Sequence, residues 1–279
     1  MIDQSGNRSF AKDIQPSGFM RSLLICHHDA PLDHDSLARW LASFSTLAGV
    51  IVITETSHAV KKRVSREWKR SGPLRFLDIL AFRVYYKIFL AKKDAAWTSA
   101  QCAALAARYP SHAAPAFHTS MINTPEVQKF IREAKPDIII ARCKHLLKKS
   151  VYGLPTIGTF VMHPGMCPEY RNAHGCFWAL ARRDVGRVGM TLLKIDDGID
   201  TGPVYGFYSY LFDERRESHI VIQTRTVLDN LSALAKKLTE IAAESATPID
   251  VSGHESAVWG QPWLSKYLSW KYRAWRTQR

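Results

Sequence analysis

A histidine and an aspartate, His163 and Asp200, stand where the sequence could support acid–base chemistry. His163 follows the short apolar run 157–162 and precedes a proline, which ends the hydrogen-bonded ladder of a predicted strand. Asp200 lies in a glycine-containing turn that follows a second apolar run, 188–195. In open α/β sheets, ligands bind in the crevice outside the carboxyl ends of the strands. We therefore expect His163 and Asp200 to meet in that crevice as an acid–base pair.

The remaining pattern predicts the elements that would position this pair. Apolar, strand-like runs at 22–26, 49–54 and 138–141 alternate with segments of helical spacing, which is typical of β-α-β units and a parallel sheet. An edge strand is predicted over 204–212, and one long helix over 218–244 closes the fold. We expect an α/β fold with a Rossmann-like, mostly parallel sheet flanked by helices and a short helical C-terminal extension.

Two motifs around the pair resemble the formyltransferase family, which formylates amines with 10-formyltetrahydrofolate. They are H-P-G-x-x-P-x-Y-R, which starts at His163 and is followed by W-A-L, and D-x-G-I-D-T-G, which contains Asp200. The resemblance extends over roughly residues 20–206. It implies a catalytic domain similar to the N-terminal domain of methionyl-tRNA formyltransferases and to sugar N-formyltransferases. It also implies catalytic roles for His163 and Asp200 and no metal ion.

The same resemblance implies a binding site for 10-formyltetrahydrofolate, formed by two loops. One loop follows the K-P-D-I-I-I run and the other contains the second motif. The residues implied in folate binding are His145, Leu146, Leu147, Asp196, Asp197 and Gly198.

The chain departs from the family pattern at two polar positions. The family's catalytic Asn, two residues before the His, is Val161 here, and a second family histidine is Leu193. A valine cannot donate a hydrogen bond to the oxyanion of a tetrahedral intermediate. Asn172 and His174 replace residues that are usually small or apolar in the family, and we expect one of them to supply the missing donor.

Three functions remain open at this stage. The first is formyl transfer to an amine of a small molecule, either a sugar or an amino-acid derivative. The second is a folate-dependent hydrolase or an altered one-carbon transferase. The third is a non-catalytic binding protein, favoured by Val161 and opposed by the retention of His163 and Asp200.

Composition bounds the class of protein and its organisation. The 279 residues are 46% hydrophobic, ample for a buried core. Five scattered cysteines fit reduced thiols, and a polar start without an apolar run predicts a cytoplasmic protein. We expect a loose arm over residues 1–20, a catalytic domain over 21–245 and a basic aromatic extension over 246–279. The extension is shorter than the second domain of methionyl-tRNA formyltransferases, which argues against tRNA as the acceptor.

Two basic and aromatic stretches indicate a further interaction. Residues 61–93 combine Lys and Arg with an apolar stripe of helical spacing, formed by Leu74, Leu77, Ala81, Val84 and Ile88. The stretch predicts a helix packed on the domain, contact with a membrane surface or lipid-linked substrate, or nucleic-acid binding. The extension from Trp263 onward predicts either an anionic membrane surface as a partner, with a location peripheral to the membrane, or docking on the domain.

Other histidines and cysteines of the chain suggest two further sites. His27 and His28 follow the first predicted strand and could touch the acceptor, although loop histidines are more often solvated. A zinc site would use His163, Cys167, His174 and Cys176, but their spacing matches no standard zinc motif.

Overall fold

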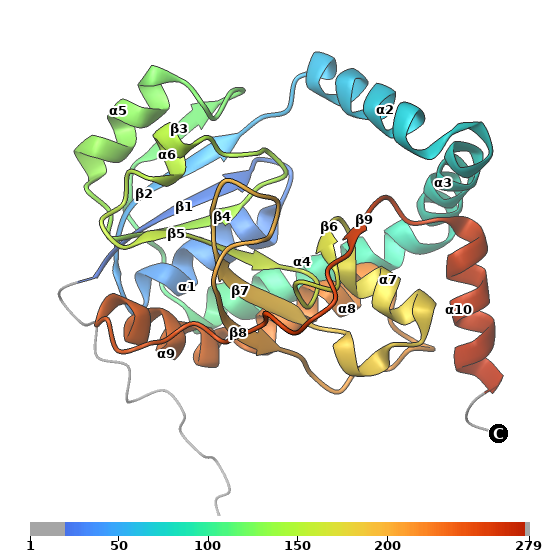
Figure 1. Ribbon diagram of the computed structural model, residues 1–279. Helices are drawn as coiled ribbons and strands as arrows, with labels where there is room; N and C mark the ends of the chain where they lie inside the picture. The colour runs from blue at the N-terminus through green and yellow to red at the C-terminus, as the bar shows by residue number, and fades with distance from the viewer. Residues whose placement is uncertain (1–19, 277–279) are drawn as a thin grey trace, which may run out of the picture.

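The computed structural model describes residues 20–276, so the predicted N-terminal arm lies outside the described residues except for Met20, which is buried. A seven-stranded sheet in the order β3-β2-β1-β4-β5-β7-β8 runs through the molecule (Figure 1). Its strands are β1 (Arg21–His27), β2 (Thr46–Ile53), β3 (Ala116–Thr119), β4 (Ile138–Arg142), β5 (Gly158–His163), β7 (Met190–Lys194) and β8 (Val204–Tyr208). The first five of these pair in parallel, which confirms the predicted Rossmann-like, mostly parallel α/β fold.

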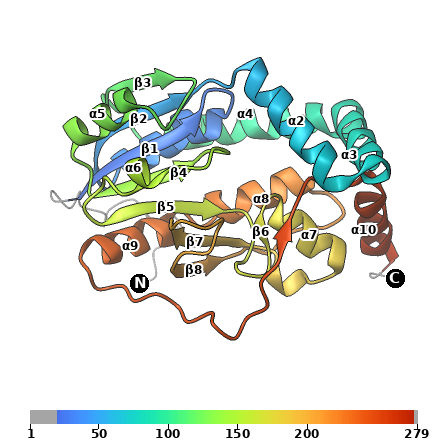
Figure 2. The same ribbon diagram turned by 45° about the horizontal axis from the view of Figure 1, so that its top comes forward.

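Helices lie on both sides of this sheet (Figure 2). They are η1 (Leu32–Leu37), α1 (Ala38–Ala42), α2 (Ser57–Ser71), α3 (Pro73–Tyr85), η2 (Tyr86–Leu90), α4 (Ala91–Arg108), α5 (Pro125–Ala134), α6 (Lys149–Tyr152), α7 (Gly175–Arg182), η3 (Val185–Arg187), α8 (His219–Leu228), α9 (Leu231–Ala242) and α10 (Leu264–Arg276). The predicted helical C-terminal extension is thus present as α10.

The central strands are apolar along their whole length because both of their faces are covered. On β1, Leu24 and Cys26 face the core beneath α1 and α9, whereas Leu23 and Ile25 face the core beneath α5. Successive side chains of a strand point to opposite faces, so one strand supplies both cores.

The direction of β7 corrects the geometric argument for the site. β7 is antiparallel to β5, with His163 opposite Thr191 and Phe160 opposite Lys194. The carboxyl end of β7 therefore lies at the opposite edge of the sheet from His163. Asp200 reaches His163 through the loop 195–203 between β7 and β8, which turns back across the strands (Figure 1).

Two other predicted elements were too long. The helix predicted over 218–244 is two helices, α8 and α9, because Asn230 leaves the helical conformation. The side-chain amide of Asn230 donates to the carbonyl oxygen of Thr226, near the end of α8. The strand predicted over 204–212 ends at Tyr208.

The C-terminal extension docks on the domain at two places. β9 (Val258–Trp259) pairs in parallel with β6 (Arg171–Asn172). α10 packs against α3 and α7, with Tyr267 and Trp270 buried in a shared aromatic core. Among residues 20–276, the helices are each too short or too polar to cross a lipid bilayer.

Candidate active site

His163 is the last residue of β5 and is almost entirely buried. Its Nε2 atom lies 2.8 Å from the carbonyl oxygen of Tyr170, and its Nδ1 atom lies 3.4 Å from Oδ2 of Asp200. The structure therefore brings together the two predicted acid–base residues, 37 positions apart in the chain. The strand fixes the backbone of the histidine, and the two acceptors fix its ring.

Asp200 is held at the tip of the loop between β7 and β8. Its φ of 51° lies in the left-handed region, which Asp tolerates better than most residues. The backbone N–H of Asn172 donates to Oδ2 of Asp200 at 2.8 Å, and Arg171 donates through Nη1 to the carbonyl oxygen of Ile199 at 3.2 Å. The β6 segment therefore positions the carboxylate, and Arg171 holds the loop that carries it.

Both ring nitrogens of His163 face acceptor atoms. A neutral imidazole has one N–H group, so a ring that carries protons on both nitrogens satisfies both acceptors. A substrate carbonyl can receive a hydrogen bond from Nε2 of this ring once it takes the place of the Tyr170 carbonyl, while Asp200 stays beside Nδ1. The next loop segment, 164–170, is close-packed at this point: a Cβ atom on Gly165 would lie 2.4 Å from the carbonyl oxygen of Tyr170.

The two family positions that lack a polar side chain are neighbours in the sheet. Val161 on β5 is the registered partner of Leu193 on β7. Both side chains contribute to a small apolar cluster that also contains Cys167 and Val204. The site therefore has an apolar wall where the family resemblance implies an amide and an imidazole.

The structure places the two proposed substitute donors differently. The side chain of Asn172 donates through Nδ2 to the carbonyl oxygen of Trp259 at 2.5 Å, while its backbone touches Asp200. His174 precedes α7, and its Nδ1 atom is buried without a partner. Its ring lies 6.1 Å from the ring of His219, within an aromatic core. The donor role of Asn172 or His174 stays a prediction.

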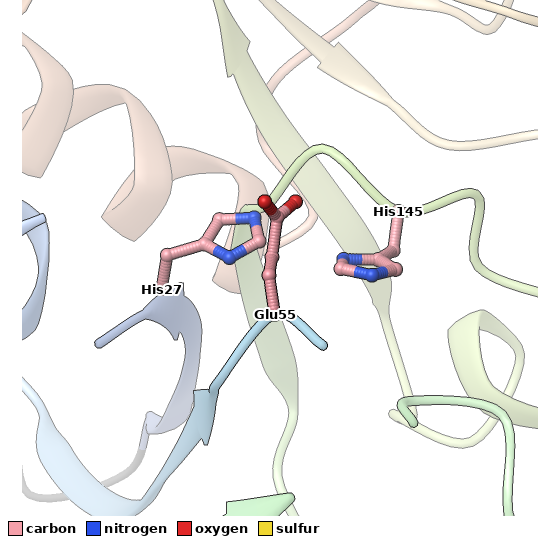
Figure 3. Close-up of side chains that lie close together, drawn as sticks. All are labelled: His27, Glu55 and His145. Atoms are coloured by element: carbon pink, nitrogen blue, oxygen red, sulfur yellow. The ribbon is translucent and has the colours of Figure 1, made fainter. Parts of the chain in front are cut away.

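A second polar cluster lies at the same edge of the sheet, at the ends of β1, β2 and β4. His27, Glu55 and His145 converge there, with one potential ligand atom from each lying within 4.8 Å of the others (Figure 3). Sequence reasoning had singled out both histidines but missed Glu55. The available signal was its place just after a buried strand, since the carboxyl ends of neighbouring parallel strands meet at one edge.

Two members of this cluster, Glu55 and His27, already have hydrogen-bond partners within the protein. Arg63 donates to both carboxylate oxygens of Glu55, at 2.5 and 2.8 Å, which lowers the pKa of Glu55 to about 2. Nε2 of His27 accepts a hydrogen bond from the backbone N–H of Lys144 at 3.0 Å, so Nε2 is the unprotonated nitrogen of a neutral ring. Burial lowers the pKa values of His27 and His145. Histidine and carboxylate ligands suit a divalent cation, which would have to replace Arg63 on the carboxylate.

The predicted folate-binding residues lie in two loops, which we call the rim, and the first loop carries His145 of the polar cluster. Leu146 is exposed and Leu147 is buried, and Asn123 ties their loop down by bonding the carbonyl oxygen of Leu146 and the backbone N–H of Lys148. In the other loop, Asp196 accepts from the backbone N–H of Gly198 and from Thr201, and Asp197 accepts from the hydroxyl of Tyr152. His145 thus belongs to both the rim and the polar cluster.

The four residues of the zinc hypothesis do not form a ligand cluster in the described part of the chain. Cys176 instead donates to the carbonyl oxygen of Gly189 at 3.1 Å, and His163 bonds as given above. The five cysteines, all within residues 20–276, are free thiols.

Residues 88–219 match the family model described as formyl transferase. The chain is 35% identical over 95 residues to the methionyl-tRNA formyltransferase of Dehalococcoides mccartyi, covering 34% of this chain and 30% of that protein. It is 34% identical over 125 residues to the corresponding protein of Kosmotoga olearia, covering 44% and 38%. The chain thus spans about a third of the length of these curated relatives.

The solved structures match most of the fold of this chain, although their sequences are only distantly similar to it. A sugar N-formyltransferase from a Shewanella species matches with a TM-score of 0.51 at 12% identity, covering 86% of this chain and 76% of that one. A phosphoribosylglycinamide formyltransferase from Anaplasma phagocytophilum matches with a TM-score of 0.50 at 13% identity, covering 87% and 99%. At these identities the two matches concern the fold alone.

Proposed function

From the match of residues 88–219 to the formyl transferase family model, we propose that the chain is a formyltransferase and that it transfers a formyl group from 10-formyltetrahydrofolate to an amine of a small molecule. The observation that supports this most directly is the 3.4 Å approach of His163 Nδ1 to Asp200 Oδ2. Both residues occupy the motif positions that the family resemblance assigns to catalysis.

The donor would supply an activated formyl group, and the residues of the chain would do the rest. Asp200 orients the ring of His163 and assists removal of the proton that the attacking amine loses. His163 donates a hydrogen bond to the oxygen that becomes negative as the carbon–nitrogen bond forms. The formyl group passes from one nitrogen to another, and the proton released by the amine is returned to the nitrogen that departs. An amino sugar or an amino-acid derivative is the acceptor class proposed here.

The loop 143–148 and the loop 196–200 are suited to hold the folate. Leu146 offers an exposed apolar side chain at the rim, which a flat heterocycle could cover. The paired Tyr152 and Asp197 border the same rim, and Asn123 keeps the first loop in place without support from a ligand. Both loops proposed to hold the folate are thus fixed by hydrogen bonds within the protein.

A second candidate function is a folate-binding protein without catalysis. The apolar pair Val161 and Leu193 favours it, since an active enzyme of this family pattern would lack one oxyanion donor. Such a donor contributes on the order of 10²–10³ in turnover in other enzymes.

Calorimetric titration with 5-formyltetrahydrofolate, followed by an assay of tetrahydrofolate release with a panel of amines, tests both candidates. We expect binding by the wild type, weaker binding by Leu146→Asp and unchanged binding by the control Leu211→Asp, which replaces another exposed leucine outside the two loops. Absence of binding at millimolar ligand contradicts both functions. Binding without release for any amine selects the non-catalytic one. Release that persists in His163→Ala, with His118→Ala as the exposed control, contradicts the assignment of the site.

A further inference from the structure

The net positive charge of the molecule is concentrated at one end. Residues 57–93 contain eleven Lys and Arg against two acidic residues, and residues 264–276 contain four against none, so the two segments together carry +13. The formal net charge of the whole chain is also +13, so the remaining residues are neutral in sum. We call the structure formed by residues 57–93 and 264–276 the basic lobe; it comprises α2, α3, η2, the first residues of α4, and α10.

These helices lie together although they come from distant parts of the sequence. α10 packs against α3, and α2 packs against α3, at the same end of the molecule (Figures 1 and 2). The hydroxyl and backbone N–H of Ser265 on α10 bond the carboxylate of Asp78 on α3, which joins the two segments directly. The lobe is therefore one continuous surface and not two separate basic tails.

The lobe also carries most of the exposed large apolar side chains. Eighteen such residues are exposed in the described chain, and eleven of them belong to the lobe: Val60, Trp68, Leu74, Leu77, Leu80, Val84, Ile88, Phe89, Leu268, Tyr272 and Trp275. A contiguous apolar surface of this kind on a folded protein marks an interaction site.

The structure shows which face of α3 packs on the domain. Ile79 and Phe82 are buried, and Phe82 contacts Phe177 and Tyr267 in the aromatic core. The predicted stripe from Leu74 to Ile88 points the other way, and Leu74 is 83% exposed. The helix thus packs on the domain, as one of the three interpretations predicts, but through Ile79 and Phe82 and not through the stripe. α3 is apolar on two faces, and one of them has no partner within residues 20–276.

A shallow groove continues this surface onto α2. It has a volume of about 410 Å³ and is lined mainly by Val60, Val64, Trp68 and Phe76, with Lys61 and Ser65 at its edge. The rings of Trp68 and Phe76 meet edge to face, with centroids 5.0 Å apart. The groove offers an apolar slot beside a cationic rim.

We propose that the basic lobe binds the surface of a bilayer rich in anionic phospholipid, with the stripe of α3 and η2 entering the acyl boundary and the surrounding Lys and Arg contacting the headgroups. Basic amphipathic helices lie in the interface in this manner, and Trp and Tyr side chains such as Trp68, Tyr272 and Trp275 favour the headgroup level. Each Lys or Arg near an anionic leaflet adds to this attraction.

Charge distinguishes this partner from two others. A second copy of the chain would bring two lobes of +13 together, and like charges at contact oppose the burial of their apolar stripes. A nucleic acid would satisfy the charge but leave eleven large apolar side chains unused. An anionic bilayer uses both properties of the lobe at once.

Vesicle co-sedimentation of the full chain tests the proposal. The wild type is expected to pellet at 0.15 M salt with phosphatidylglycerol vesicles but not with phosphatidylcholine vesicles. Two triple variants probe the lobe: Leu77→Ser, Val84→Ser and Ile88→Ser remove apolar contacts, and Lys62→Gln, Lys69→Gln and Lys87→Gln remove charge. All six residues are exposed, so neither variant disturbs the core, whereas truncation of α10 would remove the buried Tyr267 and Trp270 and uncover the aromatic core beneath them. Each triple is expected to weaken vesicle binding at least tenfold.

Matched controls lie outside the lobe. They are Met121→Ser, Leu211→Ser and Ile249→Ser for the apolar set, and Lys129→Gln, Arg132→Gln and Lys236→Gln for the charged set. Both controls are expected to pellet like the wild type. Binding that survives both lobe triples, or equal losses in the controls, overturns the proposal. So does a dimer in light scattering that the apolar triple dissolves, which would identify a second copy as the partner. RNA binding that the charge triple abolishes and the apolar triple leaves intact, without vesicle binding, overturns it in favour of nucleic acid.

Discussion

Val161 and Leu193 are registered partners on β5 and β7, so the two apolar replacements in the candidate site touch each other. A polar residue at one position alone would face a leucine or a valine at the other. The two side chains therefore form a cross-strand pair, and each provides apolar packing for the other.

This pairing predicts that the two positions are coupled in stability. Val161→Asn alone is expected to cost about 1–3 kcal/mol, because it places an amide against an apolar neighbour. Leu193→His alone should be destabilising for the same reason. The double variant can bond across the strands, so its cost should be less than the sum of the two by at least ~0.5 kcal/mol. Urea unfolding of the four proteins measures the cycle, and additive costs would contradict the coupling.

Replacing Asp200 by Asn is expected to slow formyl transfer by a factor on the order of 10²–10⁴, because the charge beside His163 is lost. The change is structurally mild. Asn tolerates the left-handed backbone at this position, and its side-chain oxygen can still accept from the backbone N–H of Asn172. Steady-state turnover and folate affinity are compared with those of Asp250→Asn, an aspartate outside the site. Full activity in Asp200→Asn would exclude a role for the carboxylate.

The substitute-donor hypothesis makes a prediction for Asn172 and His174. Both have a positive φ, so alanine would add backbone strain, and Asn172→Gly and His174→Asn are cleaner changes. Asn172→Gly keeps the backbone N–H that bonds Asp200 and removes only the side-chain amide. If that amide is the donor, the variant should reduce kcat by about 10²–10³ with little change in folate affinity. His174→Asn should retain activity. An undiminished kcat in both variants would contradict the hypothesis, because neither side chain would then supply the oxyanion donor.

Two histidines next to the basic lobe predict an acid limit of stability. Burial lowers the pKa of His174 to about 4 and that of His219 well below its ordinary value. The unfolded chain takes up protons on these residues below about pH 6.5, whereas the folded chain does not. Stability should therefore fall as the pH drops from about 6.5 towards 4, by up to roughly 1.4 kcal/mol per pH unit for each histidine.

Thermal unfolding between pH 7.5 and 4.5 measures this slope. His174→Asn should flatten the profile, and the exposed His118→Asn should not. A profile in His174→Asn as steep as that of the wild type would show that other groups cause the acid limit.

The sequence predicts the strands of this fold well because their signals are local. The runs that became β1, β2, β4 and β5 are short, apolar and bounded by turns, so each marks a strand buried on both faces. Their common direction follows from the helices between them. The position of His163 at the end of β5 was therefore accessible from local pattern alone.

The arrangement around β7 and β6 was not accessible in the same way. An apolar run carries no sign of its direction, so the antiparallel β7 looked like another parallel strand. β6 and β9 pair over two residues each across 87 positions, too short a match to show in the hydrophobic pattern. Glu55 likewise could not be assigned to a cluster from the sequence, because its neighbours His27 and His145 follow two other strands.

The β6–β9 pair also connects the C-terminal extension to the candidate active site. β9 lies in the extension that leads into α10, and its partner β6 holds Asp200 through the backbone of Asn172. A displacement of α10 therefore reaches the carboxylate that faces His163 through the two-residue ladder between β9 and β6. The site owes its alignment to a segment outside the motif-bearing domain, so that segment acts as a brace for the chemistry as well as an appendage.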